Sequence, residues 1–234
     1  MNIAHVLDGH AADSVALISR NRTTTYGELR DQINHLRGGL ASIGVGRGDR
    51  VALIGPNGSG KSSLLRVMAG LVDPVAGAVT WDDIGNGSSI QSDPDAHHRH
   101  IHFVGHADAV KPVLSVRENV SFWAKLRTSA PDVDGALSAL GIIDLADVPG
   151  RFLSAGQKRR VGLARVLAAP APLWLLDEPA TALDAGGIEA LENAIRAHRA
   201  GGGMVVVSTH QNLQIDDPHR LNLDAFPGRE QAYE

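Results

Sequence analysis

A glycine-rich stretch decides the fold: Gly55-Pro56-Asn57-Gly58-Ser59-Gly60-Lys61-Ser62, with Ser63 next. Its spacing, a glycine, four residues and then Gly-Lys-Ser, is typical of phosphate-binding loops. Glycines let successive backbone N–H groups turn inward around phosphates, and the start of a following helix adds partial positive charge. Lys61 can reach the β- and γ-phosphates of a nucleotide, and the Ser62 hydroxyl can bind Mg²⁺. For this motif alone, an ordinary glycine-rich turn is the alternative.

The composition excludes several classes of protein. The chain has 234 residues, a formal net charge of −4 and no cysteine. This length allows one large domain, or one domain with a small addition. The absence of cysteine excludes disulfides, thiolate metal sites and cysteine nucleophiles. The mild negative charge argues against a nucleic-acid partner, which needs a basic footprint. Neither a signal peptide nor a membrane-spanning stretch is visible, so we expect a soluble chain.

Apolar runs alternate with helical patterns from Val51 onward. The runs predict strands at 51–54, 78–81, 101–104, 173–176 and 204–207. The patterns predict helices at 60–70, 115–126, 132–140, 157–168 and 187–198. Ser115 with Glu118 predicts a capping box for the second of them, and Asp132 is the candidate cap of the third. The polar stretch 85–95 is interpreted as a surface loop. Apolar strands that alternate with helices predict an α/β fold, with a mostly parallel sheet and helices on both faces.

Two carboxylates follow the apolar run at 173–176. Asp177 and Glu178 are expected at the carboxyl edge of the sheet, where ligands of such folds bind. There Asp177 can hold Mg²⁺, and Glu178 can polarise an attacking water molecule. Taken alone, a solvated strand end is the alternative.

Later motifs resemble those of ABC transporter ATPases. The five residues Leu153, Ser154, Ala155, Gly156 and Gln157 are similar to the ABC signature, with Ala155 where a second glycine is common. Asp184 matches the D-loop, and His210 matches the switch histidine. The phosphate loop, signature, acidic strand, D-loop and switch histidine occur in the family's order. The resemblance implies a P-loop ATPase fold over about residues 54–234, with a helical signature subdomain at about 107–160.

The resemblance also implies a mechanism. Two ATPase domains would enclose two ATP molecules, with the signature of each subunit completing the site of the other. ATP and Mg²⁺ would be bound, Lys61 would contact the phosphates, Glu178 would be the general base and His210 would sense the γ-phosphate. The implied partners are a second copy of the chain and integral membrane permease subunits. The implied location is the cytoplasmic face of the inner membrane, as a peripheral subunit.

A finer resemblance is to the ATP-binding subunit of bacterial haem exporters in cytochrome c maturation. It is carried by Phe103–His106, Glu118–Trp123, the signature with its following arginines, and Leu173–Pro179. His106 stands at the Q-loop position, where most ABC ATPases have glutamine. The implied cargo is haem, handled by the permease. The sequence leaves open the ATPase of another exporter, a soluble ABC regulator and an inactive fusion module.

Residues 1–53 follow a different pattern. Two short strands are predicted at 15–18 and 23–26, and a helix that opens with Thr25 and Glu28 is predicted to reach Ile43. This segment resembles the start of AMP-forming acyl-CoA synthetases, whose catalytic regions are missing, so ligase chemistry is not expected. The chain is therefore interpreted as a mosaic. Because the expected adenine-stacking aromatic residue is absent, we expect weaker adenine affinity, with Tyr26 as a substitute.

Five of the eleven histidines lie close together, at positions 97, 98, 100, 102 and 106. One interpretation is a metal or haem site, because alternation along a strand would align His98, His100 and His102. The other is a polar loop that leads into the strand at 101–104. We expect no specific haem binding at this cluster.

Overall fold

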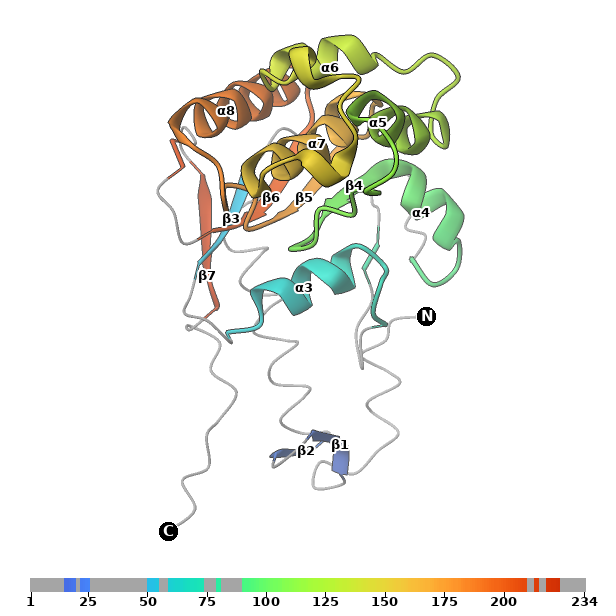
Figure 1. Cartoon of the computed structure of the whole chain (residues 1–234). Helices are drawn as coiled ribbons and strands as arrows, with labels where there is room; N and C mark the ends of the chain where they lie inside the picture. The colour runs from blue at the N-terminus through green and yellow to red at the C-terminus, as the bar shows by residue number, and fades with distance from the viewer. Residues whose placement is uncertain are drawn as a thin grey trace.

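The site rests on a parallel sheet of five strands, which Figure 1 shows in the computed structural model of the chain. The strands are β3 (Arg50–Ile54), β4 (Ile101–Val104), β5 (Leu173–Asp177), β6 (Met204–Ser208) and β7 (His219–Asn222). They lie in the order β4-β5-β6-β3-β7, and every neighbouring pair is parallel. The predicted parallel sheet is confirmed.

The structure describes residues 15–19, 22–25, 50–54, 59–73, 79–80, 90–209, 213–214 and 218–223, the first two ranges and Arg50 by backbone alone. Four of the predicted strands correspond to β3, β4, β5 and β6. Of the predicted strand at 78–81, only residues 79 and 80 are described, so its bounds stay a prediction.

The central strands are apolar because both of their faces are covered. All five residues of β5 are buried, and so are Val205, Val206 and Val207 of β6. The register pairs Leu176 with Val207, and Asp177 with Ser208. Buried strands of this kind read as continuous apolar runs, since no face is left for polar side chains. The register also brings the polar ends of β5 and β6 to one edge.

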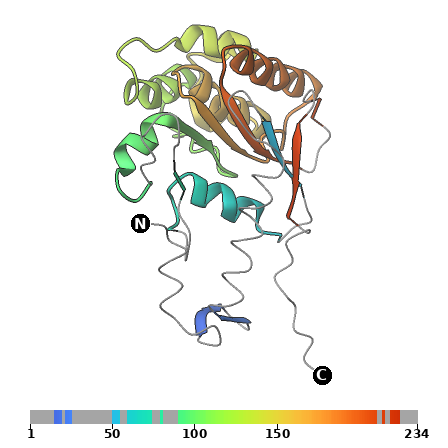
Figure 2. The ribbon, with the colours of Figure 1, turned by 180° about the vertical axis from the view of Figure 1, so that it is seen from behind.

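Helices cover the two faces of the sheet. Helix α3 (Lys61–Met68) packs on one face against β5 and β6. Helices α5 (Val116–Lys125), α6 (Val133–Ala139), α7 (Ala155–Leu167) and α8 (Ala185–Ala200) lie on the other, as Figures 1 and 2 show. Two short 3-10 turns, η1 (Ile143–Leu145) and η2 (Gly150–Phe152), connect α6 to α7. The core accordingly has two parts, one around Leu65 and Leu175 and one around Leu163 and Leu176.

Side-chain caps fix where these helices begin. Ser115 and Glu118 form the predicted capping box of α5, and Asp132 caps α6 through the Gly135 N–H. Helices α7 and α8 each begin two residues earlier than predicted, directly after Ser154 and Asp184. Their first turns contain small residues without apolar periodicity, so the pattern missed them, although each cap satisfies a backbone donor of the first turn.

One prediction is wrong. The loop assigned to 85–95 ends at Asp93, because helix α4 (Pro94–His100) begins there, with Asp93 accepting from the Ala96 N–H. An aspartate cap followed by proline is a favoured helix start. Three of the clustered histidines therefore lie on a helix, not on a loop or strand. Within the described residues, no three His, Asp or Glu side chains gather in a way that could hold a metal ion.

The N-terminal segment contains a separate hairpin. Strand β1 (Val15–Ser19) pairs antiparallel with β2 (Arg22–Thr25), as predicted. The helix predicted from Thr25 to Ile43, and Tyr26 within it, lie outside the described residues. Among the helices that are described, none has the length and apolar character needed to cross a bilayer.

His102 is a buried histidine with a shifted pKa. It lies on β4 with a relative exposure of 6%, and its Nε2–H donates to the Ala169 carbonyl at 2.9 Å. Burial, together with the positive charge of Arg127, lowers the pKa of His102 from 6.5 to about 4. The ring is therefore neutral in the folded chain over a range in which an exposed histidine takes up a proton.

We expect the free energy of unfolding to fall as the pH drops from about 6.5 to about 4. The unfolded chain has the higher His102 pKa and binds the proton first, so each pH unit in this window costs the native state up to about 1.4 kcal/mol. Urea unfolding at several pH values measures the slope. His102→Gln keeps an N–H donor and does not titrate, so its slope should be shallower than that of the wild type. Equal slopes for wild type and His102→Gln would contradict this expectation.

Candidate functional site

Three side chains meet where β5 ends. Asp177 is 2% exposed, and its Oδ1 accepts from the Ser62 hydroxyl at 3.0 Å and from the Ser208 hydroxyl at 2.6 Å. Ser62 comes from the start of α3, Asp177 from β5 and Ser208 from β6. The structure thus brings the phosphate-loop motif and the acidic strand end into direct contact. Parallel strands explain this, because their carboxyl ends share one edge of the sheet.

The described part of the phosphate-loop motif runs from Ser59 to Ser63, whereas Gly55, Pro56, Asn57 and Gly58 lie outside the described residues. Gly60 precedes α3 with a φ of +94°, a conformation that favours glycine. Lys61 is the first residue of α3 and is 7% exposed. The Ser59 hydroxyl is buried without a hydrogen-bond partner in the described structure. A buried donor at a helix start fits an anionic ligand such as phosphate.

The same edge suits a divalent cation. Asp177 makes no ion pair with any residue that the structure describes, although it is buried. A buried carboxylate is costly unless strong donors or a cation face it. Hydroxyl and carboxylate oxygens are also the ligands that Mg²⁺ prefers. The predicted metal residues, Ser62 and Asp177, therefore form a donor set that fits Mg²⁺.

Glu178 follows Asp177 in a strained backbone conformation. Its φ is +48°, in the left-handed region that side chains other than glycine rarely adopt. Its backbone N–H donates to the Ser208 carbonyl at 3.0 Å and lies 3.2 Å from the Ser208 hydroxyl. The side chain is partly buried. Strain of about 1–3 kcal/mol at such a residue persists only where the surroundings enforce it, and it is concentrated at functional sites.

The signature residues form the start of α7. Ser154 accepts from the Gln157 N–H at 3.2 Å, and the Gln157 side chain accepts from the Ser154 N–H at 2.8 Å. Leu153 is buried and Ala155 is the first residue of the helix. A cavity of about 380 Å³ opens beside this turn and is lined by Ser154, Gly156, Gln157, Arg160, Ala182 and Asp184.

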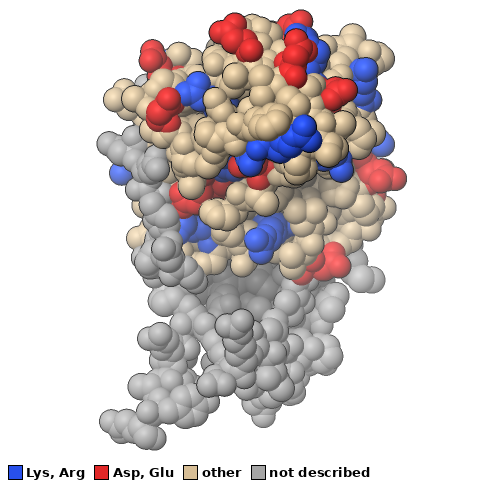
Figure 3. All heavy atoms as spheres, in the orientation of Figure 1, with Lys and Arg blue, Asp and Glu red and all other residues tan. Residues whose placement is uncertain are grey.

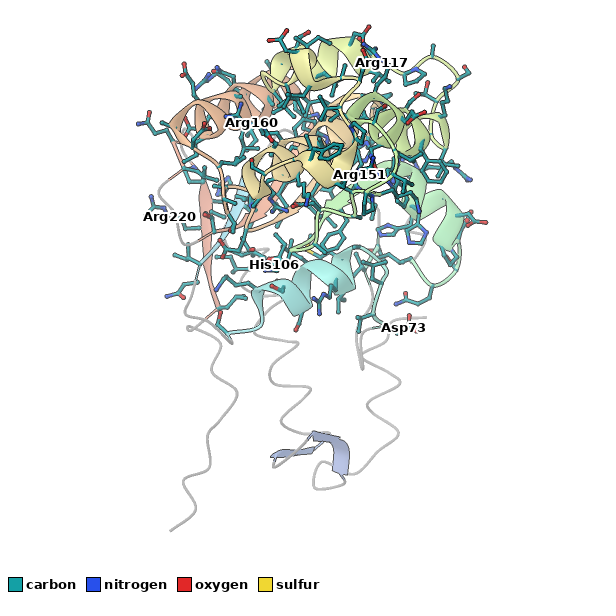
Figure 4. All side chains as sticks on the ribbon, in the orientation of Figure 1. Asp73, His106, Arg117, Arg151, Arg160 and Arg220 are labelled. Carbon is teal, nitrogen blue, oxygen red and sulfur yellow. The ribbon has the colours of Figure 1, made fainter. Side chains whose placement is uncertain are left out.

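The signature turn touches the loop after β5. A Cβ on Gly156 would lie 2.6 Å from the Ala182 carbonyl oxygen, so only glycine allows this approach. Ala182 itself has a φ of +65°. Asp184 caps α8 by accepting from the Gly187 N–H at 2.8 Å, and it forms an ion pair with Arg160 of α7, which is labelled in Figure 4. These hydrogen bonds hold the pKa of Asp184 below its usual value.

The remaining predicted positions lie apart. His106 is exposed on the loop after β4, on the side of α3 (Figure 4). It lines a cavity of about 630 Å³ together with Arg66 of α3, Trp123 of α5 and Arg165 of α7. His210 lies outside the described residues, so its position relative to Glu178 stays a prediction.

One buried residue of the site carried no predicted role. Arg159 is 3% exposed on α7 and donates to the loops after β4 and β5. On the face shown in Figure 3, positive and negative side chains are interspersed at the surface. Arg159 differs from these charged residues because its guanidinium is buried. A signal was available, since residue 159 shares a helix face with Leu163, which is also buried.

Comparison with known proteins assigns the family. The ABC transporter family profile matches residues 40–181. The chain belongs to the ABC transporter ATPases. Within them it groups with the CcmA proteins: it is 56% identical over 186 residues to the cytochrome c biogenesis ATP-binding export protein CcmA of Rhodospirillum rubrum, covering 79% of this chain and 78% of that protein. The CcmA of Paramagnetospirillum magneticum is 52% identical over 201 residues, covering 82% and 91%.

The fold agrees with this assignment, and the N-terminal segment has a second relationship. A putative ABC transporter ATP-binding protein from Pyrococcus furiosus superposes with a TM-score of 0.65 at 26% identity, covering 76% of this ABC ATPase and 86% of that chain. The predicted ABC ATPase fold is confirmed. The profile of AMP-binding enzymes matches residues 4–59, which confirms the resemblance seen in the N-terminal sequence.

Gly156→Ala tests the close approach between the signature turn and the loop after β5. The added methyl would meet the Ala182 carbonyl, so we expect a loss of about 1–3 kcal/mol of stability and a fall in ATP turnover. Gly186→Ala is the matched control, because on α8 its Cβ meets nothing within 4 Å and should stabilise the helix by about 0.5–1 kcal/mol. Thermal unfolding and ATPase assays measure both. Equal melting temperatures for Gly156→Ala and wild type would refute the constraint.

Proposed function

We propose that this ABC ATPase binds and hydrolyses MgATP as the ATP-binding subunit of an exporter in cytochrome c biogenesis, with haem as the cargo of the permease. The observation that carries the proposal is the 3.0 Å hydrogen bond between Ser62 and Asp177, which joins the phosphate-loop helix to the acidic strand. The names of the CcmA relatives, ATP-binding export proteins of cytochrome c biogenesis, support the biological role.

The phosphates of ATP would lie in the loop formed by residues 55–63, with Lys61 against the β- and γ-phosphates. Ser62 and Asp177 would hold Mg²⁺, which neutralises charge on the phosphate oxygens when bound. Glu178 would accept a proton from the attacking water, and His210 would contact the γ-phosphate. The backbone of Glu178, fixed by its hydrogen bonds to Ser208, favours a single position for that carboxylate.

The signature would act on ATP held by a second copy of the chain. Ser154 and Gly156 lie at the start of α7, where unpaired N–H groups and the helix dipole favour a phosphate. The cavity of about 380 Å³ beside this turn leaves space for a ligand next to Ser154 and Gly156. Two copies would therefore enclose two ATP molecules, and Asp184 would lie in the D-loop between the two sites.

Permease subunits would dock beside the loop that carries His106. The cavity of about 630 Å³ there is bordered by exposed apolar side chains, among them Trp123 at 39% exposure and Leu71 at 58%. Docking would place the chain at the cytoplasmic face of the inner membrane, while the permease carries the cargo.

The chain would divide into two parts. Residues 1–53 would form a segment related to AMP-binding enzymes, and residues 54–234 the ABC ATPase domain with its helical subdomain at about 107–160. The match of AMP-binding enzymes to residues 4–59 supports a boundary near β3. Nucleotide affinity would then depend on the phosphates more than on the base.

Glu178→Gln tests the general base. Losing a base should lower ATP turnover about 10²–10⁴-fold and leave ATP binding intact. In MgATP the variant should also accumulate as a dimer, which sizing detects. The matched control is Glu189→Gln, an exposed glutamate on α8, which should keep wild-type turnover. Unchanged turnover in Glu178→Gln would refute the assignment.

Metal dependence gives a second test. EDTA should abolish ATP turnover and added Mg²⁺ should restore it. Because the Ser62 hydroxyl is one of the proposed ligands, Ser62→Ala should raise the Mg²⁺ concentration for half-maximal turnover about 10-fold or more. Ser138→Ala, at an exposed serine of α6, is the control. A Mg²⁺ response that is identical in Ser62→Ala and wild type would exclude this hydroxyl as a ligand.

A further inference from the structure

Every donor of one buried guanidinium is used. Arg159 Nε donates to the Pro179 carbonyl at 3.1 Å. Its Nη2 donates to the carbonyls of Asp177 and Glu178, each at 2.8 Å. Its Nη1 donates to the Gly105 carbonyl at 2.8 Å and to the Asp108 carboxylate at 3.1 Å. A guanidinium has five N–H donors in a fixed planar fork, so these five bonds satisfy it completely.

The acceptors belong to two loops that are far apart in the sequence. Three of them are consecutive carbonyls at the end of β5 and just after it, those of Asp177, Glu178 and Pro179. The other two belong to the loop after β4, on either side of His106. Arg159 itself lies on α7, two residues beyond the signature. One side chain thus joins the loop of the proposed general base, the loop at the proposed docking cavity and the signature helix.

We propose that Arg159 is a positioning residue of the ATPase reaction, which fixes the backbone of Glu178 and locks it to the loop carrying His106. This inference rests on the proposed function. The strained φ of +48° at Glu178 needs enforcement from its surroundings. Ser208 holds the Glu178 N–H on one side and Arg159 holds the Glu178 carbonyl on the other. These two hydrogen bonds together hold the backbone of Glu178 in the strained conformation, and so fix the position from which its carboxylate extends.

The chemistry of the contact favours arginine over any other residue. Four of its five acceptors are backbone carbonyls at fixed positions, and the rigid fork reaches them together. A lysine offers three donors from a single nitrogen, which cannot span both loops. The ion pair with Asp108 supplies the opposite charge that a buried guanidinium needs.

Residues 59–63, the described part of the phosphate loop, take part in none of these hydrogen bonds. Lys61 and Ser62 are positioned by α3 on the opposite face of the sheet. Arg159 also contacts the carbonyl of Asp177, but that residue is held in addition by strand pairing with Ser208 of β6. Loss of Arg159 should therefore displace Glu178 more than the groups that bind MgATP. Misplacement of a reacting group by about 1 Å can cost about 10²-fold in rate. The expected signature is a fall in kcat with little change in KM.

The experiment compares Arg159→Gln and Arg159→Lys with Arg117→Gln, a matched change at a partly exposed arginine of α5. We expect kcat to fall about 10–100-fold in both Arg159 variants, with KM for ATP and the Kd of a fluorescent ATP analogue within about 3-fold of wild type. Arg117→Gln should keep the wild-type kcat, because exposed ion pairs contribute little. Circular dichroism verifies folding.

A double-mutant cycle separates positioning from general stabilisation. If Arg159 acts through Glu178, Arg159→Gln combined with Glu178→Gln should be no slower than Glu178→Gln alone, within about 3-fold. A residue that merely stabilises the fold would add its own loss. Additive effects, a wild-type kcat in folded Arg159→Gln, or KM rising in parallel with the fall in kcat would each overturn the proposal.

Asp108→Ala provides a second test of the proposal if the Arg159 variants do not fold. It removes one of the five acceptors, at a side chain that is 23% exposed, and should lower kcat while leaving KM unchanged. A wild-type kcat in Asp108→Ala would then overturn the proposal. The proposed function fails separately, if the wild type shows no Mg²⁺-dependent turnover that Glu178→Gln abolishes.

Discussion

The hydrogen bond from the Ser62 hydroxyl to the Asp177 carboxylate is the contact on which the site depends. It forms because β3 and β5 run parallel, so the segments that follow them reach one edge of the sheet. Burial of Asp177 then has a chemical consequence. A carboxylate held only by hydroxyls, with no cation among the described residues, is stabilised further by a divalent ion. The packing that completes the sheet therefore also brings together the oxygen ligands that the proposed Mg²⁺ site needs.

Strain is concentrated in the short loop that follows. Glu178 and Ala182 both have positive φ. Gly156 packs against the Ala182 carbonyl, and Arg159 donates a hydrogen bond to the Glu178 carbonyl. A loop with few contacts would relax to ordinary conformations. Here contacts from β6 and α7 hold it on two sides, so the carboxylate of Glu178 stands on a rigid backbone.

The sequence predicted the features that local patterns encode. The apolar runs of β5 and β6 and the capping residues at 115 and 132 placed these strands and helices α5 and α6 correctly. Strands that are buried on both faces, and helix ends that need a side-chain cap, each have a local pattern in the sequence. Helix α4 was missed because its polar residues show no apolar period. The role of Arg159 was missed because its acceptors are mostly backbone carbonyls 18 to 54 positions away, which no side-chain motif records.

The placement of Arg159 links two events of the proposed mechanism. Ser154, at the start of α7, and Arg159 are separated by little more than one helical turn, about 7–8 Å along the axis. A helix is stiff over that distance. If the start of α7 moves when it meets ATP held by a second copy, the guanidinium moves with it, and so do the backbones of Glu178 and Gly105. Closure of the dimer and alignment of the general base would then be one motion of one helix, since the signature turn cannot shift without Arg159.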